Sequence, residues 1–108
     1  MKNKNTIQKG SVRYIVFKED STWYAVGLEF NIIESGDDPK EVLLFLFEAM
    51  KGYVKSARKI KSRPQILNQK SDEEYERLWN KLIENSKNGK ESSIKTPVYT
   101  FGRTLAFV

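Results

Sequence analysis

The chain has 108 residues, of which 39% are hydrophobic and 12% aromatic, and its formal net charge is +5. This length suits one domain with one core, and the apolar content argues against a disordered chain. Cysteine and histidine are both absent, which excludes disulfides, thiol nucleophiles and zinc sites built on these residues. Histidine is also the commonest general acid or base near neutral pH, so most enzyme classes are disfavoured.

The first ten residues, MKNKNTIQKG, are polar and basic, and they predict a flexible tail before a single domain over residues 11–108. No apolar core follows these basic residues, so a secretory signal is not expected. The longest apolar run, Val42 to Phe47, is far shorter than the roughly 20 residues of a membrane-spanning helix. We therefore expect a cytoplasmic protein without a membrane segment.

Three strands are predicted before the first helix. β-branched and aromatic residues are frequent in Ser11–Lys18, SVRYIVFK, and in Trp23–Phe30, WYAVGLEF. A turn over residues 19–22 would join them as a hairpin, and a third short strand is expected over residues 31–34. Apolar residues occupy both alternating sets of positions in the first two strands, which predicts a sheet covered on both faces.

The start of the first helix is strongly specified. Asp38 suits the N-cap, Pro39 suits the first turn, and Glu41 has the capping-box spacing. The helix is expected to run from Pro39 to about Lys61 and to end before Pro64. Its apolar arc covers roughly 200°, whereas a one-sided surface helix needs only about 100°. The surplus must be covered by another element or by a second chain.

A second, amphipathic helix is predicted from Asp72 to about Asn85, as an insertion at about residues 71–86. Ser71 and Glu74 have the spacing of a second capping box. Apolar side chains recur at helical intervals, namely Tyr75, Leu78, Trp79, Leu82 and Ile83. This apolar stripe is one candidate for covering the surplus arc of the first helix.

The polar residues 86–97 predict a loop, and Val98–Val108 predicts a closing strand. Gly102 within that strand marks either a bulge or a close approach of another group. The order of elements is therefore β-β-β-α-(α)-β. A strand that returns after helices to a sheet begun by a hairpin predicts an α+β two-layer sandwich.

Carboxylates gather at the corner before the first helix, at Glu34, Asp37 and Asp38. Such a cluster can hold Mg²⁺ for phosphoryl chemistry. Acids at a helix start are already explained by capping and by the helix dipole, and the spacing does not match a calcium loop. No catalytic residue, metal ligand or cofactor site is therefore assigned.

Residues 51–70 carry seven basic residues and no acid, whereas residues 29–50 carry a local net charge of −5. The basic segment is interpreted either as a solvated helix face or as a nucleic-acid-binding surface. Only Tyr53 supplies an interleaved aromatic, and no helix-turn-helix, zinc-finger or RNP signature is present. Weak, salt-sensitive binding would then be expected. The residues of this alternative are Lys55, Arg58, Lys59, Lys61 and Arg63.

A hydrophobic partner-binding surface is the other candidate site. Its members come from the first helix and from the second strand, namely Leu44, Phe47, Trp23 and Tyr24. The alternative interpretation is that these side chains complete the core of a monomer, because a wide apolar arc demands coverage without specifying the covering element.

Residues from Tyr14 to Tyr53 resemble the HicB-like family, the antitoxin half of HicA/HicB toxin–antitoxin pairs. The resemblance is carried by YIVFKED, TWYAVGLEF, IIESGD and DPKEVLLFLFEAM, in this order and spacing. It implies a partial ribonuclease-H-like β-β-β-α-β fold that lacks the catalytic carboxylates of the nuclease. It also implies a non-enzymatic interaction module that binds and masks a small HicA-like ribonuclease toxin. The resemblance also implies a homo-oligomer, and we expect a dimer.

Overall fold

The computed structural model describes residues 10–60, 64–88 and 96–105, so most of the predicted tail and of the predicted 86–97 loop lies outside it. The α+β class and the predicted order of strands and helices are confirmed. In chain order the elements are β1 (Ser11–Glu19), β2 (Thr22–Gly27), β3 (Ile32–Gly36), α1 (Pro39–Lys59), a 3₁₀ turn (Pro64–Leu67), α2 (Glu73–Asn88) and β4 (Val98–Leu105).

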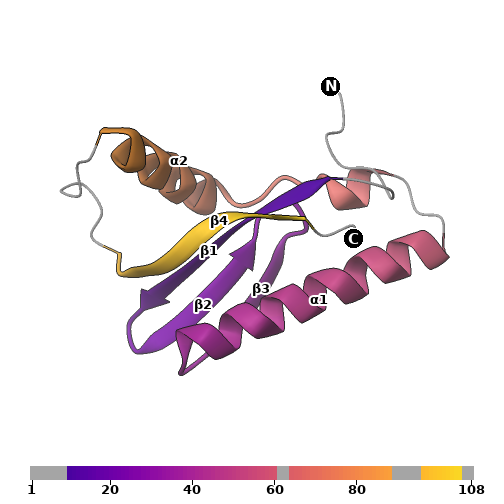
Figure 1. Cartoon of the computed structure of the whole chain (residues 1–108), viewed down its shortest axis with the longest axis horizontal. Helices are drawn as coiled ribbons and strands as arrows, with labels where there is room; N and C mark the ends of the chain where they lie inside the picture. Colours follow the sequence, from indigo (N-terminus) through magenta and orange to yellow (C-terminus); the bar gives the residue numbers. More distant parts are fainter. Residues whose placement is uncertain (1–9, 61–63, 89–95, 106–108) are drawn as a thin grey trace.

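The four strands form one antiparallel sheet in the order β3-β2-β1-β4 (Figure 1). Helix α1 lies against one face and forms a two-layer unit with the sheet, while α2 lies on the opposite face (Figure 1). No helix in the described part of the chain is long and apolar enough to cross a membrane. The central strand β1 is therefore covered on both sides, as the double apolar pattern predicts.

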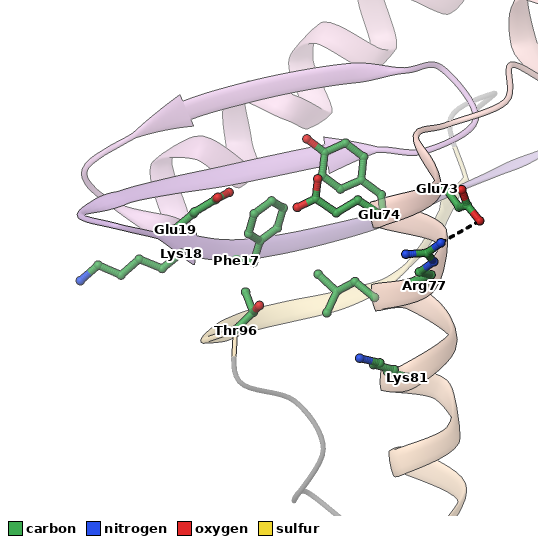
Figure 2. A pocket seen from close by; sticks show the side chains of 10 residues that line it. Phe17, Lys18, Glu19, Glu73, Glu74, Arg77, Lys81 and Thr96 are labelled. Atoms are coloured by element: carbon green, nitrogen blue, oxygen red, sulfur yellow. Dashed lines mark hydrogen bonds and ion pairs between the residues drawn. The ribbon is translucent and has the colours of Figure 1, made fainter.

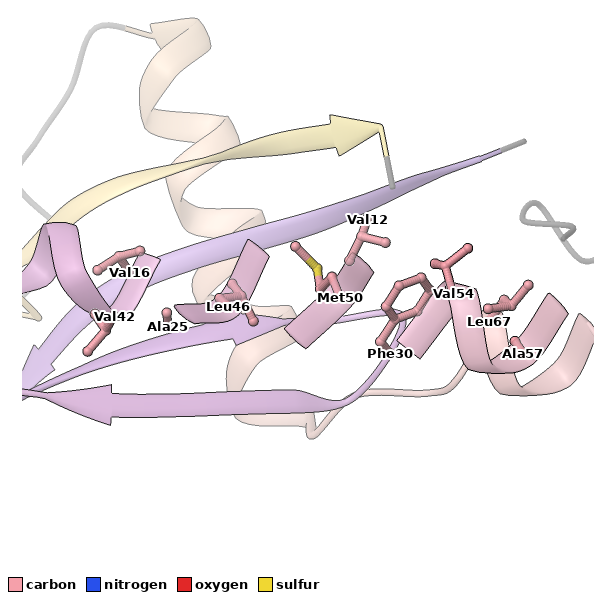
Figure 3. Packing of buried hydrophobic residues seen from close by; sticks show 10 residues of the cluster. All are labelled: Val12, Val16, Ala25, Phe30, Val42, Leu46, Met50, Val54, Ala57 and Leu67. Atoms are coloured by element: carbon pink, nitrogen blue, oxygen red, sulfur yellow. The ribbon is translucent and has the colours of Figure 1, made fainter. Parts of the chain in front are cut away.

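Alternation along β1 distributes its side chains between two cores. Val12 and Val16 are fully buried beneath α1, whereas Ile15 and Phe17 are buried on the α2 side, because successive side chains point to opposite faces of a strand. Figure 3 shows the first core, in which Met50 and its neighbours on α1 meet the sheet. Since α2 packs on the other face, it does not cover the surplus apolar arc of α1.

Helix α1 starts as predicted. The Asp38 carboxylate accepts a hydrogen bond from the backbone amide of Lys40 at 3.0 Å, and Pro39 occupies the first turn. Gly36, just before this corner, has little space, because an added Cβ would lie 2.9 Å from Cγ1 of Val42. The glycine therefore allows the helix to pack closely on the strand. The buried positions of α1 are Val42, Leu46, Met50, Val54 and Ala57.

Strand β2 ends at Gly27, earlier than the predicted Phe30, and β3 is correspondingly displaced to Ile32–Gly36. The backbone amide of Asn31 donates to the carbonyl of Leu28 at 3.2 Å, and Asn31 has φ of 55°. This tight turn, which asparagine tolerates better than most residues, separates the two strands.

The connector after α1 contributes to the core, which the sequence did not predict. Leu67, in the 3₁₀ turn, is fully buried in the α1-side core. The Tyr53 hydroxyl donates to the carbonyl of Ile66 at 2.7 Å, and Gln69 donates its side-chain amide to the same hydroxyl at 2.6 Å. These contacts hold the chain against the domain as it crosses from one face of the sheet to the other.

Helix α2 begins at Glu73, and the predicted pairing of Ser71 with Glu74 is replaced by another contact. The buried Ser71 hydroxyl donates to the Glu76 carboxylate. From α2, Trp79 and Leu82 are buried against the sheet.

Arg13 ties α2 to the sheet. Its guanidinium donates twice to Glu76, at 2.8 Å each, and once to Glu29 at 2.6 Å. Burial lowers the pKa of Arg13, but the bonds to Glu76 and Glu29 outweigh burial and raise it overall. The same bonds hold the pKa of the Glu76 carboxyl below its ordinary value, against the opposing effect of burial and with help from Ser71. Opposite charges thus favour the charged form of both groups.

Strand β4 contains an irregularity at Tyr99 and not at Gly102. Val16 pairs with Thr100 while Phe17 pairs with Val98, so Tyr99 is the extra residue. Gly102 is the close-approach site, because the ring of Tyr14 covers it and an added Cβ would lie 3.0 Å from the Tyr14 hydroxyl.

Candidate protein-binding surface

The two predicted residues of α1 lie on neighbouring parts of the helix but differ in burial. The Leu44 side chain is 62% exposed. Phe47 is half-buried, and its ring meets Tyr14 of β1 edge-on with 5.2 Å between the centroids. Phe47 therefore contributes to the edge of the core and to the surface, which combines the two interpretations that the sequence leaves open.

Trp23 lies on the same side of the sheet as Phe47. It is half-buried against the α1-side core, and its ring lies edge-on to Tyr99 of β4 at 6.3 Å. The Lys18 ammonium lies 5.8 Å from the Trp23 ring centroid, in the range of a cation–π contact. Tyr99 itself is 43% exposed.

Tyr24 does not join this group. It lies on the α2 side of the sheet, where its ring stacks on Phe17 at 5.6 Å. Adjacent strand residues point to opposite faces, so Trp23 and Tyr24 cannot belong to one surface. The alternation of side chains between the two faces of a strand is the sequence signal that separates Trp23 from Tyr24.

The position of α1 explains why aromatic side chains are accessible here. The helix packs mainly on β3 and β2 and less on β1. Among the described residues, therefore, no helix covers the α1 side of β4. Sequence reasoning missed Tyr14 and Tyr99, because their contribution depends on the pairing of β1 with β4 and on the bulge. We call Tyr14, Trp23, Phe47 and Tyr99 the aromatic surface.

The carboxylates before α1, at Glu34, Asp37 and Asp38, form an acidic corner that borders the aromatic surface. Trp23 pairs with Gly36 across the β2–β3 ladder, so the carboxylates that follow Gly36 lie at the same end of the sheet. Asp37 and Asp38 are exposed, and Asp38 caps α1. No group of three or more acidic residues in the described part of the chain is arranged to hold a metal ion. The corner therefore supplies negative charge beside an aromatic surface.

The predicted basic surface is described only in part. Lys55, Arg58 and Lys59 are exposed on the last turns of α1, whereas Lys61 and Arg63 lie outside the described residues. Tyr53 is half-buried and hydrogen-bonded to the connector, so it does not present its ring for base stacking. The structure thus shows positive charge without an interleaved aromatic among these residues.

A groove of about 520 Å³ separates the end of β1 from the first turns of α2, and sequence reasoning gave no signal for it (Figure 2). Both signs of charge surround it, and Glu73 pairs with Arg77 at 3.0 Å. Burial, together with nearby carboxylates, raises the pKa of Tyr75, so this phenol stays protonated and is a poor general base at neutral pH. The lining residues are Phe17, Lys18, Glu19, Glu73, Glu74, Tyr75, Arg77, Leu78, Lys81 and Thr96.

Comparison of the chain with protein-family models, with curated proteins and with solved structures finds no match. Function is therefore inferred from the chemistry of the surface and from the sequence resemblance.

Proposed function

We propose that this chain is a non-enzymatic, cytoplasmic protein-binding module of the HicB type, which binds and masks a basic partner such as a small HicA-like ribonuclease. The observation that carries the proposal is the aromatic surface beside the acidic corner. Trp23 and Tyr99 have large, partly exposed rings on the sheet, and aromatic side chains of this kind are enriched among residues that dominate binding energy.

The charges next to these rings suit a basic partner. Asp37, Asp38 and Glu41 are exposed at the start of α1, and carboxylates at the edge of an interface raise the association rate with a positively charged protein. Burial of the rings would supply affinity, while the acidic corner would set orientation.

The test is a calorimetric titration with the protein encoded by the neighbouring gene, which the proposal expects to be a small basic ribonuclease. Tyr99→Ala should weaken binding by about tenfold or more, because the ring belongs to the contact. Ile33→Ala is the matched control, since Ile33 is 44% exposed against 43% for Tyr99 but lies on β3, opposite Val26 of the α2-side core. Equal affinity of both variants, or no binding by the wild type, contradicts the proposal.

Nucleic-acid binding is the second candidate, and it is favoured by Lys55, Arg58 and Lys59 at one exposed end of α1. Such binding depends on phosphate contacts and decreases steeply with salt. A titration with RNA and with DNA at several salt concentrations distinguishes the two functions. Absence of affinity at the lowest salt concentration eliminates this candidate.

A further inference from the structure

Strand β4 forms one edge of the sheet, and no strand among the described residues pairs with its outer side (Figure 1). Its sequence, VYTFGRTL, contains neither lysine nor proline, and Arg103 is its only charged residue. An edge strand presents a row of unpaired backbone N–H and C=O groups, and lysine and proline are among the residues that protect such edges from pairing. The outer edge of β4 is therefore a template for a further strand.

The backbone groups of Arg13 show how β4 is oriented. The Arg13 carbonyl accepts a hydrogen bond from the amide of Leu28 at 2.9 Å, and the Arg13 amide donates to the Glu29 carboxylate at 2.8 Å. Both groups thus point away from β4, although Arg13 lies directly opposite Arg103 in the β1–β4 ladder. The two arginines therefore form a non-hydrogen-bonded pair, and the N–H and C=O groups of Arg103 point toward the outer edge.

The same ladder identifies the other free backbone groups. Hydrogen-bonded and non-hydrogen-bonded pairs alternate along an antiparallel ladder, and the pairing of β4 is regular from Thr100 onward, beyond the bulge at Tyr99. The N–H and C=O groups of Phe101 therefore also point outward, whereas those of Thr100 and Gly102 bond to β1. Phe101 and Arg103 each offer one donor and one acceptor to an added strand.

The side chains of these two residues determine which strand fits. Both lie on the α2 side of the sheet, where the Phe101 ring is 5.8 Å from that of Trp79 and the Arg103 guanidinium is 5.6 Å from the Trp79 centroid. Arg103 is exposed and forms no ion pair with any described residue, whereas Arg13 opposite it is held by two carboxylates. On an added strand, an apolar side chain would cover Phe101 and an acidic one would face Arg103.

We propose that β4 binds an extended peptide segment of another protein as a fifth strand of the sheet, and that an apolar and an acidic residue stand two positions apart in this segment. The backbone of the segment bonds to Phe101 and Arg103, and its acidic side chain pairs with the Arg103 guanidinium. Backbone hydrogen bonds supply affinity in strand addition, and the side chains supply specificity. Such binding does not depend on the proposed function, since it requires neither the acidic corner nor a ribonuclease.

Charge complementarity favours an acidic segment of another protein over parts of this chain. Residues 1–10 contain Lys2, Lys4 and Lys9 and no acid, so pairing of these residues along β4 would place like charges near Arg103. A second copy of β4 also brings no acid, because this strand contains none. An acidic peptide is therefore the occupant that matches the charge of the edge.

Amide hydrogen exchange of the full chain, followed by NMR, tests the proposal residue by residue. In the free chain, the amides of Phe101 and Arg103 should exchange quickly and those of Thr100 and Gly102 slowly. The probe is a threonine peptide as long as β4 that contains one valine and one glutamate two positions apart. At a peptide concentration about ten times the dissociation constant, exchange at Phe101 and Arg103 should slow by about tenfold. The amide of Ile33, on the opposite edge strand β3, should not change.

Three results of this measurement would overturn the proposal. Slow exchange of Phe101 and Arg103 in the free chain at every protein concentration would show that residues of this chain cover the edge. Protection that increases with protein concentration in the absence of peptide would show that a second copy covers it. Failure of the peptide to slow exchange at these two amides would show that the edge does not bind an added strand.

Variants of Arg103 test the side-chain pairing separately. Replacement of the glutamate in the peptide by lysine should weaken binding to the wild-type chain by about fivefold or more, since like charges then face each other. The preference should reverse for Arg103→Glu and disappear for Arg103→Gln, which keeps the backbone donor and removes the charge. Equal affinity of the wild-type chain for both peptides, or an unchanged preference in Arg103→Gln, overturns the acidic specificity.

Discussion

Arg13→Met tests how α2 is held on the sheet. The substitution keeps a long apolar side chain but removes two hydrogen bonds to Glu76, at 2.8 Å each, and one to Glu29 at 2.6 Å. The Arg13 side chain is only 17% exposed, and Glu29 and Glu76 are 18% and 32% exposed. Two carboxylates would thus lose their cation in a partly desolvated site.

The expected cost follows from these contacts. Breaking a buried ion pair by removing one partner costs about 3–5 kcal/mol, and the partial exposure of Glu76 reduces this. Loss of the contact with Trp79, whose ring centroid lies 5.6 Å from the guanidinium, adds somewhat less than about 1 kcal/mol. Relief of repulsion from Arg103, which pairs directly with Arg13 across the strands, offsets a similar amount. We expect a net loss of about 2–3 kcal/mol.

Urea denaturation followed by tryptophan fluorescence measures this loss, because Trp79 lies within the same cluster. In thermal unfolding, the same loss should lower the melting temperature by about 10 °C for a domain of this size. Arg77→Met is the matched control, since the ion pair of Arg77 with Glu73 is 71% and 79% exposed and should contribute less than about 0.5 kcal/mol. Equal costs for the two variants, or no coupling between Arg13→Met and Glu76→Gln in a double-mutant cycle, refute this reasoning.

Further predictions concern pH and packing. The pKa of Glu76 is lower in the folded chain than in the unfolded one. The Glu76 carboxylate therefore stabilises the fold at pH values above the ordinary pKa of a carboxyl group, and this stabilisation is lost as the pH falls through the folded-state pKa. Acid titration of the free energy of unfolding should show this loss, and Glu76→Gln should reduce the slope; an unchanged slope contradicts the assignment. Gly36→Ala should destabilise by about 1–2 kcal/mol, because the added carbon would lie 2.9 Å from Val42; a stability equal to wild type in urea would exclude the clash. Leu67→Ala should cost about 2–4 kcal/mol, as expected for a fully buried side chain, and a loss below about 0.5 kcal/mol, typical of a surface site, would show that the connector is not part of the core.

The features that were predictable from the sequence are those with local physical causes. Asp38 and Pro39 specify a helix start through contacts within one turn, so no knowledge of the remaining fold is needed. The apolar residues on both faces of β1 likewise predict coverage from two sides, because side-chain direction alternates strictly along a strand.

The features that were missed depend on contacts between distant parts of the chain. The bond between Arg13 and Glu76 joins residues 63 positions apart, and neither residue type carries a signal of its partner. Tyr99 belongs to the aromatic surface only because β4 bulges against β1. The placement of Tyr24 was predictable from the sequence, because adjacent residues of a strand point to opposite faces and Tyr24 follows Trp23 directly.

The wide apolar arc of α1 is explained only when exposure is known. The sequence predicts that the arc needs coverage, and the structure places α2 on the other face of the sheet. Leu44, Phe45 and Ile60 therefore stay exposed.

The central claim, that this chain masks a basic ribonuclease through its aromatic surface, is tested most directly by RNA cleavage. The small basic ribonuclease that the proposal expects to be encoded by the neighbouring gene is titrated with wild-type protein and with Tyr99→Ala while cleavage of a fluorescent RNA is followed. The account predicts that cleavage stops at a stoichiometric amount of wild-type chain and that the variant requires a large excess. Cleavage that continues at saturating wild-type chain, or that both proteins stop equally, would contradict it.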